Sequence, residues 1–225
     1  RSPACLEKIL SRLPQVILAS GSPRRLALLR SIGIEPLVQP AFFDEQIQAG
    51  EDAHQLVRRL AHGKLAAVLA HGLKHGPSAP PAHRKLNDTV GVEGNTALLI
   101  GADTVVVLDG AVMGKPGTPG MALSMLERLS GRVHLVMTGL ALMSIPDGTL
   151  DISVAETEVR FRELDPEEIC AYVEREDVTD VAGAYRIQDL GAVLVREIHG
   201  SWSNVVGLPL ELFAARVHAL GFSVL

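Results

Sequence analysis

Two adjacent arginines at the start of an expected helix are the first residues in this sequence that could do chemistry. The segment Ser20-Gly21-Ser22-Pro23-Arg24-Arg25 follows an apolar run at residues 16–19 and precedes a helical pattern that reaches residue 31. A helix start offers unpaired N–H groups and the positive end of the helix dipole, and guanidinium groups bind phosphate well. Ser22 suits the N-cap and Pro23 the first helical position. We interpret the turn as a candidate anion site; an ordinary capped helix with solvated arginines is the alternative.

Asp103 is the carboxylate most suited to acid–base or metal chemistry. It lies between apolar runs at residues 97–100 and 105–108, where an ionised group is costly to bury without a metal or a hydrogen-bonding partner. It could be a metal ligand or a general base, or it could cap the end of a strand. Glu45, in the acidic pair after two phenylalanines, is the second candidate, and a solvated surface carboxylate is its alternative. The two carboxylates could together suffice for Mg²⁺, which accepts one or two carboxylates plus substrate phosphates.

Two lysines and one glutamine complete the set of candidate residues. Lys64 lies on an expected helix over residues 54–69, and Lys115 is displayed in the turn Gly114-Lys115-Pro116. Either lysine could reach a phosphate or could simply be solvated. Gln188 ends the segment Gly183-Ala184-Tyr185-Arg186-Ile187-Gln188, and its amide can pair with a base edge through a donor and an acceptor; a surface glutamine is the alternative. Together these cations and carboxylates form the set needed to hold a triphosphate with a metal and to attack phosphorus with water.

Composition narrows the class of ligand. The chain has 225 residues, of which 47% are hydrophobic, 4% are aromatic and 21% are charged, and its net charge is −5. The acidic balance and scarce aromatics disfavour a nucleic-acid partner, so the local arginines indicate a small anionic ligand. Two cysteines are too few for a disulfide scaffold and favour a reducing compartment. No apolar run approaches the ~20 residues that span a bilayer. We therefore expect a soluble, cytoplasmic protein without a membrane partner.

Strands and helices alternate along the chain, so we expect an α/β fold with a mixed sheet. A long insertion, rich in Gly, Pro, His and Asn, separates the helix of Lys64 from the strand that leads to Asp103; it covers about residues 72–96. Residues 200–209 are expected to form a loop that enters the last helix. The periodicity and turn signals predict strands over residues 16–19, 35–39, 97–100, 105–108, 134–145, 150–161 and 193–198, and helices over 22–31, 54–69, 118–129, 210–220 and from 165 onward.

Taken together, these motifs resemble the Maf family of nucleoside triphosphate pyrophosphatases, and they run in the family's order from about residue 16 to 220. The resemblance implies one domain over residues 1–225 with a fold like that of the inosine triphosphatase-like enzymes, in which a mixed twisted sheet with flanking helices forms two lobes around a deep cleft. The matching motifs are Leu18-Ala19-Ser20-Gly21-Ser22-Pro23-Arg24-Arg25, Phe43-Asp44-Glu45, Arg59-Leu60-Ala61 with Lys64, Gly101-Ala102-Asp103-Thr104, Gly114-Lys115-Pro116, Leu129-Ser130-Gly131-Arg132 with His134 and Thr138-Gly139, Gly183-Ala184-Tyr185 with Ile187-Gln188, and Asn204-Val205-Val206-Gly207-Leu208-Pro209.

The same resemblance implies an activity and a role for each site residue. It implies hydrolysis of a nucleoside triphosphate to the monophosphate and pyrophosphate with Mg²⁺, Mn²⁺ or Co²⁺, in the branch that acts on dTTP, UTP and modified pyrimidine nucleotides rather than on 7-methyl-GTP. It also implies a homodimer. The implied roles are the proton acceptor for Asp103, base preference for Arg24, Thr104 and Gln188, phosphate or other substrate contacts for Ser20, Ser22, Arg25, Lys64 and Lys115, and the metal for Glu45 together with Asp103.

Three positions depart from the family pattern. Gly63 stands where a Glu often precedes the lysine, Arg186 stands at a position that is often Gly and could alter substrate choice, and Asp189 stands where Gly usually follows the glutamine, so the backbone there could differ. The insertion is longer than usual and could be a lid or a tolerated surface loop. A non-catalytic nucleotide-binding regulator of cell division or septum formation remains the alternative function.

Overall fold

A seven-stranded mixed sheet organises the chain, which confirms the predicted α/β class. The computed structural model describes residues 11–41, 43–71 and 96–225, so the expected insertion lies outside the described residues except for Thr96. The strand order is β3-β2-β4-β6-β7-β8, with β5 also paired to β4. The neighbours β3, β2 and β4 run parallel and the remaining pairs are antiparallel, whereas β1 and β9 form a separate parallel pair.

The element bounds agree with most of the sequence predictions to within a few residues. The strands are β1 (Ser11–Arg12), β2 (Gln15–Leu18), β3 (Leu37–Val38), β4 (Ala97–Leu108), β5 (Ala111–Met113), β6 (Val133–Ile145), β7 (Leu150–Phe161), β8 (Val195–His199) and β9 (Phe222–Ser223). The helices are α1 (Pro23–Ser31), α2 (Ala53–His71), α4 (Pro119–Leu129), α5 (Pro166–Arg175), α6 (Trp202–Val206) and α7 (Leu210–Ala219), with 3₁₀ helices η3 (Ala182–Ala184) and η4 (Asp189–Leu194).

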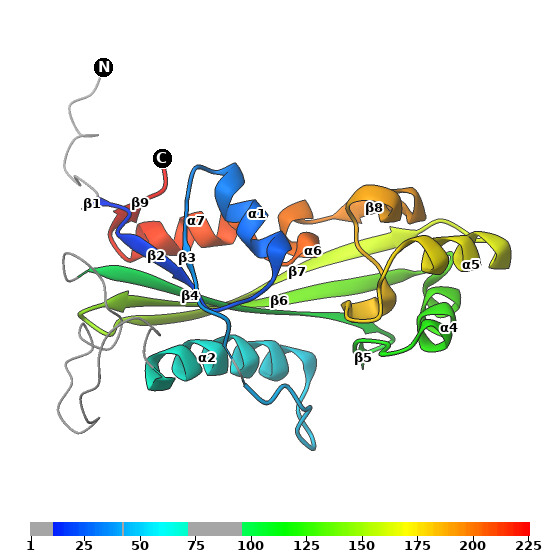
Figure 1. The fold of residues 1–225 in the computed structure, drawn as a ribbon, viewed down its shortest axis with the longest axis horizontal. Coiled ribbons are helices and arrows are strands. Elements are labelled where there is room, and N and C mark those ends of the chain that lie inside the picture. The colour runs from blue at the N-terminus through cyan, green and yellow to red at the C-terminus, as the bar shows by residue number, and fades with distance from the viewer. Residues whose placement is uncertain (1–10, 42, 72–95) are drawn as a thin grey trace.

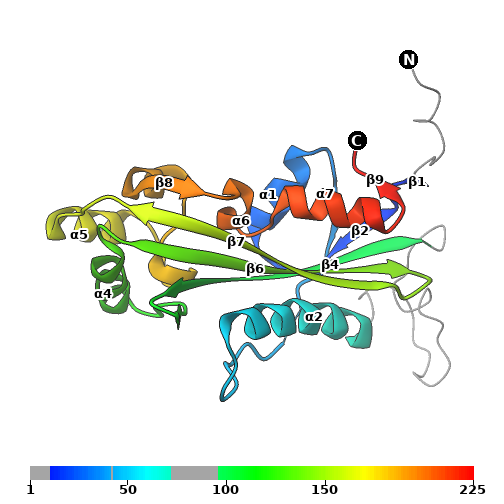
Figure 2. The ribbon, with the colours of Figure 1, turned by 180° about the vertical axis from the view of Figure 1, so that it is seen from behind.

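Helices cover both faces of the sheet. Figures 1 and 2 show α2 on one face and α1, α6 and α7 on the other, while α4 and α5 lie at one end of the long strands. The apolar core divides in the same way, because successive side chains of a strand point to opposite faces. Ile17 and Leu99 belong to the cluster under α2, whereas Leu18 and Ile100 belong to the larger cluster on the opposite face.

Two predictions about element boundaries were wrong. β4 is one continuous strand of 12 residues rather than two runs broken at residues 101–104, because these short residues keep their pairing with β6 (Asp103 lies opposite Gly139). The expected loop over residues 200–209 contains the five-residue helix α6, whose N-cap Ser201 accepts a hydrogen bond from the Asn204 N–H. A helix this short spans too few residues to produce a visible apolar period.

Candidate active site

A gap in the strand pairing along β4 creates the place where the candidate residues meet. β2 pairs with residues 97–100 of β4, and β5 pairs with residues 106–108. Because β6 takes the other edge of β4 along nearly its whole length, β2 and β5 lie on the same edge. Within the part of the chain that the structure describes, no strand covers residues 101–105 on that edge. We call these five residues the sheet notch; the turn after β2 and the turn after β5 flank it.

The sheet notch presents two polar side chains to opposite faces of the sheet. Asp103 and Thr104 are consecutive, so one points toward α2 and the other toward α1 and α6. On the α2 side the helix approaches the strands closely, because a Cβ at Gly101 would lie 2.3 Å from the Ala61 carbonyl oxygen and one at Gly139 would lie 2.1 Å from that of Val57. This close approach brings a lysine one turn further along α2 within reach of Asp103.

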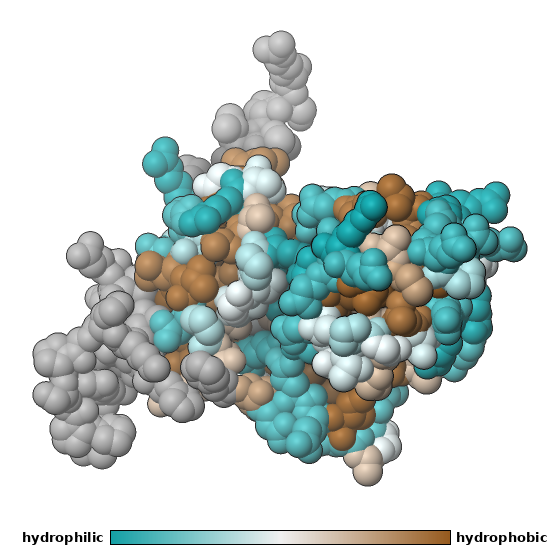
Figure 3. Space-filling view, turned by 45° about the vertical axis from the view of Figure 1, so that its right-hand side comes forward, coloured by the Kyte–Doolittle hydropathy of each residue, from teal (hydrophilic) through white to brown (hydrophobic). Residues whose placement is uncertain are grey.

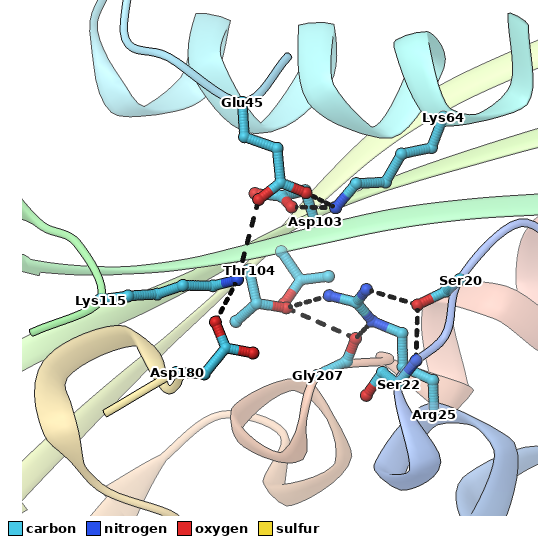
Figure 4. Close-up of polar contacts among 11 residues, drawn as sticks. Ser20, Ser22, Arg25, Glu45, Lys64, Asp103, Thr104, Lys115, Asp180 and Gly207 are labelled. Atoms are coloured by element: carbon cyan, nitrogen blue, oxygen red, sulfur yellow. Dashed lines mark hydrogen bonds and ion pairs between the residues drawn. The ribbon is translucent and has the colours of Figure 1, made fainter. Parts of the chain in front are cut away.

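On the α2 side, one ammonium group joins both candidate carboxylates. The Nζ atom of Lys64 lies 2.5 Å from Oδ1 of Asp103 and 2.8 Å from Oε1 of Glu45 (Figure 4). Lys64 and Asp103 are both buried, where opposite charges attract more strongly than in water. Partial burial would raise the pKa of Glu45, but the hydrogen bond and charge of Lys64, with Lys115 and Arg25, hold that pKa below its ordinary value. Glu45 is therefore ionised at neutral pH.

Lys115 reaches the same place from the turn after β5. Its Nζ lies 2.8 Å from Oδ1 of Asp180 and 3.9 Å from Oε2 of Glu45 (Figure 4). The hydrogen bond to Asp180 raises the pKa of Lys115, so the side chain stays charged. Asp180 belongs to none of the sequence motifs. Its only signal is its position shortly before the Gly183 motif, and the ion pair becomes visible only once the fold brings the two turns together.

On the other face, the guanidinium group of Arg25 connects three segments. Its Nε donates to the Gly207 carbonyl oxygen at 2.8 Å, and its Nη1 and Nη2 donate to the hydroxyl oxygens of Ser20 at 3.1 Å and Thr104 at 3.2 Å (Figure 4). These contacts use three of the five N–H donors of the group, so two remain. Burial lowers the pKa of Arg25 and the nearby Asp103 opposes this effect. Arg25 thus fixes the β2–α1 turn to the sheet notch as well as bordering the cavity.

Arg25→Lys is expected to lower the free energy of unfolding by about 3 kcal/mol, because a lysine cannot make the three directed hydrogen bonds at once and at least two to a charged donor are lost. Urea unfolding measures the difference. Arg30→Lys is the matched control: Arg30 lies on the same helix and, among the described residues, its side chain pairs only with the exposed Glu35, so little stability should be lost. Equal losses in the two variants would contradict the structural role of Arg25.

The candidate residues line one cavity of about 620 Å³. Figure 3 shows hydrophilic side chains gathered around a recess near the middle of the face it presents. Arg24 donates no hydrogen bond to any described residue. Burial lowers the pKa of Arg24, the positive charge of Arg186 lowers it further, and the negative charge of Asp180 opposes both effects. The Ser22 side chain makes no capping bond to α1 and no hydrogen bond to another described residue, so its hydroxyl can donate to a ligand. The cavity lining includes every candidate site residue: Ser20, Ser22, Arg24, Arg25, Glu45, Lys64, Asp103, Thr104, Lys115 and Gln188.

Comparison with known proteins agrees with this arrangement. The family described as Maf-like protein matches residues 15–220, which is nearly the whole chain. The chain belongs to the Maf family. It is 40% identical over 197 residues to the dTTP/UTP pyrophosphatase of Syntrophus aciditrophicus, covering 88% of this chain and 85% of that protein. It is 41% identical to the dTTP/UTP pyrophosphatases of Moorella thermoacetica, over 88% of this chain and 91% of that protein, and of Acetivibrio thermocellus, over 94% and 98%.

Two of the departures from the Maf pattern have a local explanation. A Cβ at Gly63 would lie 2.3 Å from Cζ of Phe43. The absence of a side chain at Gly63 therefore lets the Phe43 ring pack against α2, and Phe43 lies two residues before Glu45 in the sequence. Asp189 has φ of +53°, which lies in the left-handed region that favours glycine but that Asp tolerates. The backbone after Gln188 therefore adopts a conformation that a glycine would also adopt.

The third departure, Arg186, is held mainly by the end of α5. Its Nη1 donates to Oε2 of Glu176 at 2.9 Å, its Nη2 donates to the Asp177 carbonyl oxygen, and its backbone N–H donates to the Tyr172 hydroxyl at 3.2 Å. Its Nε is buried without a hydrogen-bond partner among the described residues. Arg186 borders the cavity, but these bonds hold its guanidinium group against the wall of the cavity.

Three aromatic rings lie behind the Gln188 segment. His134 on β6 hydrogen-bonds through Nε2 to the Tyr185 hydroxyl at 2.8 Å, and both rings meet Phe161 edge to face. Burial lowers the pKa of His134 to about 4 and raises the pKa of Tyr185. Both side chains are therefore neutral near pH 7. His134 and Tyr185 both lie in sequence motifs, but no spacing signal indicates that they pair.

The His134 ring is expected to make stability depend on pH. The unfolded chain binds a proton at this ring below pH ~6.5, whereas the folded protein does so only below about pH 4. Stability contributed by the neutral ring is thus fully present above pH ~6.5 and decreases as the pH falls toward 4, by up to about 3 kcal/mol. Urea unfolding at pH 7 and pH 4.5 measures this loss. His134→Gln should show a smaller loss, and an identical loss would contradict the assignment.

Proposed function

We propose that this Maf protein hydrolyses dTTP and UTP to the monophosphate and pyrophosphate. The observation that carries the proposal is the convergence of Asp103, Glu45 and Lys64 with Arg24 and Lys115 on one cavity. Cations along such a cavity can neutralise a triphosphate, and a carboxylate beside them can accept a proton. The names of the three relatives, which are 40–41% identical to this chain, support the same reaction and the pyrimidine preference.

The cations of the cavity bind the phosphates in this proposal. Arg24 donates to none of the residues that the structure describes, and Lys115 is paired with Asp180, whose side chain is 86% exposed. An ion pair this exposed is weak, so a phosphate oxygen can replace Asp180 as the partner of Lys115. The hydroxyl of Ser22 and the remaining N–H groups of Arg25 are further donors. In this proposal the α-phosphorus lies beside Asp103.

The carboxylates suit a divalent metal. Glu45 and Asp103 supply hard oxygen donors that lie close together, because one oxygen of each carboxylate contacts the Lys64 ammonium. Two carboxylates match the way Mg²⁺ binds, since it retains waters and takes phosphate oxygens for its other ligands. The described residues contain no group of three or more His, Cys, Asp or Glu side chains that could hold a metal alone, so the substrate completes the site. When bound, a Mg²⁺, Mn²⁺ or Co²⁺ ion polarises the phosphoryl group and lowers the pKa of water.

Asp103 acts on the attacking water. The water oxygen forms a bond to the α-phosphorus as the bond from that phosphorus to the bridging oxygen breaks, and pyrophosphate leaves with the electron pair. Asp103 accepts the proton that the water loses. Lys64, whose Nζ lies 2.5 Å from Oδ1 of Asp103, holds the carboxylate in place for the attack. The Gln188 amide and the Thr104 hydroxyl contact the pyrimidine.

The family resemblance also leads us to propose one domain over residues 1–225, a homodimer and a cytoplasmic location without nucleic-acid or membrane partners. None of the helices that the structure describes is long and apolar enough to cross a membrane.

A nucleotide panel with pyrophosphate detection tests the proposed activity. One preparation is assayed with dTTP, UTP, CTP, ITP and 7-methyl-GTP in Mg²⁺, Mn²⁺ and Co²⁺, and the highest kcat/KM is expected for dTTP and UTP. A preference for a purine nucleotide would contradict the role of Gln188. Tight triphosphate binding without pyrophosphate release in any of the three metals would favour the non-catalytic regulator instead.

A further inference from the structure

The segment that carries Gln188 has an unusual backbone. Gly183 and Ala184 both have positive φ, +68° and +61°, and for Ala184 this left-handed conformation carries a steric penalty. Ala184 and Tyr185 are buried, whereas Gln188 is partly exposed to the cavity. The Gln188 side chain has no hydrogen-bond partner among the described residues, so its own contacts do not fix its direction. Something else must hold the segment in this conformation.

Three hydrogen-bonded contacts tie residues 183–188 to elements distant in sequence, in addition to the core packing of Ala184, Tyr185 and Ile187 and the close approach of Gly183 to Val106 on β4. One of the three reaches the central strands through side chains. The Gly183 N–H donates to the Gly114 carbonyl oxygen at 3.2 Å in the turn of Lys115, and Arg186 is bound to the end of α5. Tyr185 is the third: its ring lies 4.8 Å from that of Phe161, and its hydroxyl hydrogen-bonds to His134. Among the side-chain hydrogen bonds found in the described residues, this one alone joins the segment to β6.

The chemistry of the pair favours a fixed geometry. His134 is 2% exposed and Tyr185 is 4% exposed, so water cannot replace the hydrogen bond if it breaks. The Nδ1 atom of His134 is buried without a partner, which leaves the bond to Tyr185 as the only hydrogen bond of the ring among the described residues. The ring packs edge to face on both neighbours, so its position and its hydrogen bond reinforce each other.

We propose that His134 is a positioning residue: by holding the Tyr185 hydroxyl it fixes residues 183–188 against the sheet and so fixes the Gln188 amide at the nucleobase end of the cavity. The inference rests on the proposed function, in which Gln188 contacts the pyrimidine. It adds that base discrimination depends on a side chain that does not line the cavity. A purely structural role of the rings would affect stability without affecting the choice of base.

The test compares His134→Ala and Tyr185→Phe with the wild type. Both variants remove the hydrogen bond, and Tyr185→Phe keeps the ring, so it serves if His134→Ala does not fold. We expect KM for UTP to rise by about tenfold, as for the loss of one well-made hydrogen bond, with a smaller change in kcat and a lower ratio of kcat/KM for UTP over CTP. His134→Gln, which returns a polar group near the Nε2 position, should recover part of the ratio.

Leu142→Ala is the matched control for stability, since Leu142 is buried on the far part of the same strand. It should be destabilised but keep the wild-type ratio. Amide hydrogen exchange of the free proteins gives a second readout: residues 183–188 should exchange faster in His134→Ala and not in Leu142→Ala. Unchanged base ratios and unchanged exchange in His134→Ala would overturn the inference. If the wild type does not hydrolyse UTP, the proposed function fails, and the exchange measurement still decides whether His134 positions the segment.

Discussion

Asp103→Asn is expected to lower kcat for dTTP and UTP by about 10²–10⁴-fold, the usual effect of losing one positioned acid–base group. The amide keeps the size of the side chain and an oxygen that can accept a hydrogen bond from Lys64, now 2.5 Å away. It cannot take a proton from the attacking water, and it carries no charge for a metal. KM should therefore change less than kcat. Steady-state kinetics with pyrophosphate detection measures both constants.

Asp109→Asn is the matched control. Asp109 follows the same strand, at an exposed turn with φ of +52°, where Asn is well tolerated. It loses only an exposed ion pair with Arg132, which contributes little, so its kcat should stay close to that of the wild type. Turnover of dTTP by Asp103→Asn near the wild-type rate would show that another group accepts the proton.

Local signals predicted most elements of this fold. Helix α4 begins after Thr118, which accepts the capping hydrogen bond from Met121, and the Asp109-Gly110 turn joins β4 to β5. Both features depend on residues close together in the sequence. The continuity of β4 does not, because its polar centre is held by pairing with β6 some 36 residues later, Asp103 with Gly139. A pattern read along one strand carries no information about that partner.

The candidate site shows the same division. Residue types predicted which side chains could hold a triphosphate, and all of them line one cavity. The sequence did not predict the sheet notch, because it results from the registers of β2 and β5 on one edge of β4. Nor did it predict that Arg25 is bound to Gly207, 182 residues away. Such contacts are tertiary, so only the folded chain reveals which cations remain free for a ligand.

Lys64→Met is expected to have the second large effect, on both catalysis and stability. Its Nζ is bonded to Asp103 and Glu45, and removing one partner from a buried charge cluster typically costs about 3 kcal/mol or more. The two carboxylates would then lie close together without the cation that now contacts both, and their negative charges would repel each other. We expect kcat/KM for UTP to fall by about 10²–10³-fold, as for loss of one preorganised electrostatic group. Kinetics and urea unfolding measure the two effects.

Divalent cations distinguish the explanations for that loss. If the two carboxylates form the metal site, Mg²⁺ or Mn²⁺ can replace the missing ammonium, and either ion should restore more stability to Lys64→Met than it adds to the wild type. Lys64→Arg keeps the charge and should lose less stability. Arg58→Met is the matched control: it lies on the same helix and donates to the Ile152 carbonyl oxygen outside the cavity, so neither its activity nor its response to metal should change. Full activity in Lys64→Met would show that the ammonium is not needed to hold Asp103 for the reaction. If metal restored no stability to Lys64→Met, Glu45 and Asp103 would not bind a cation together.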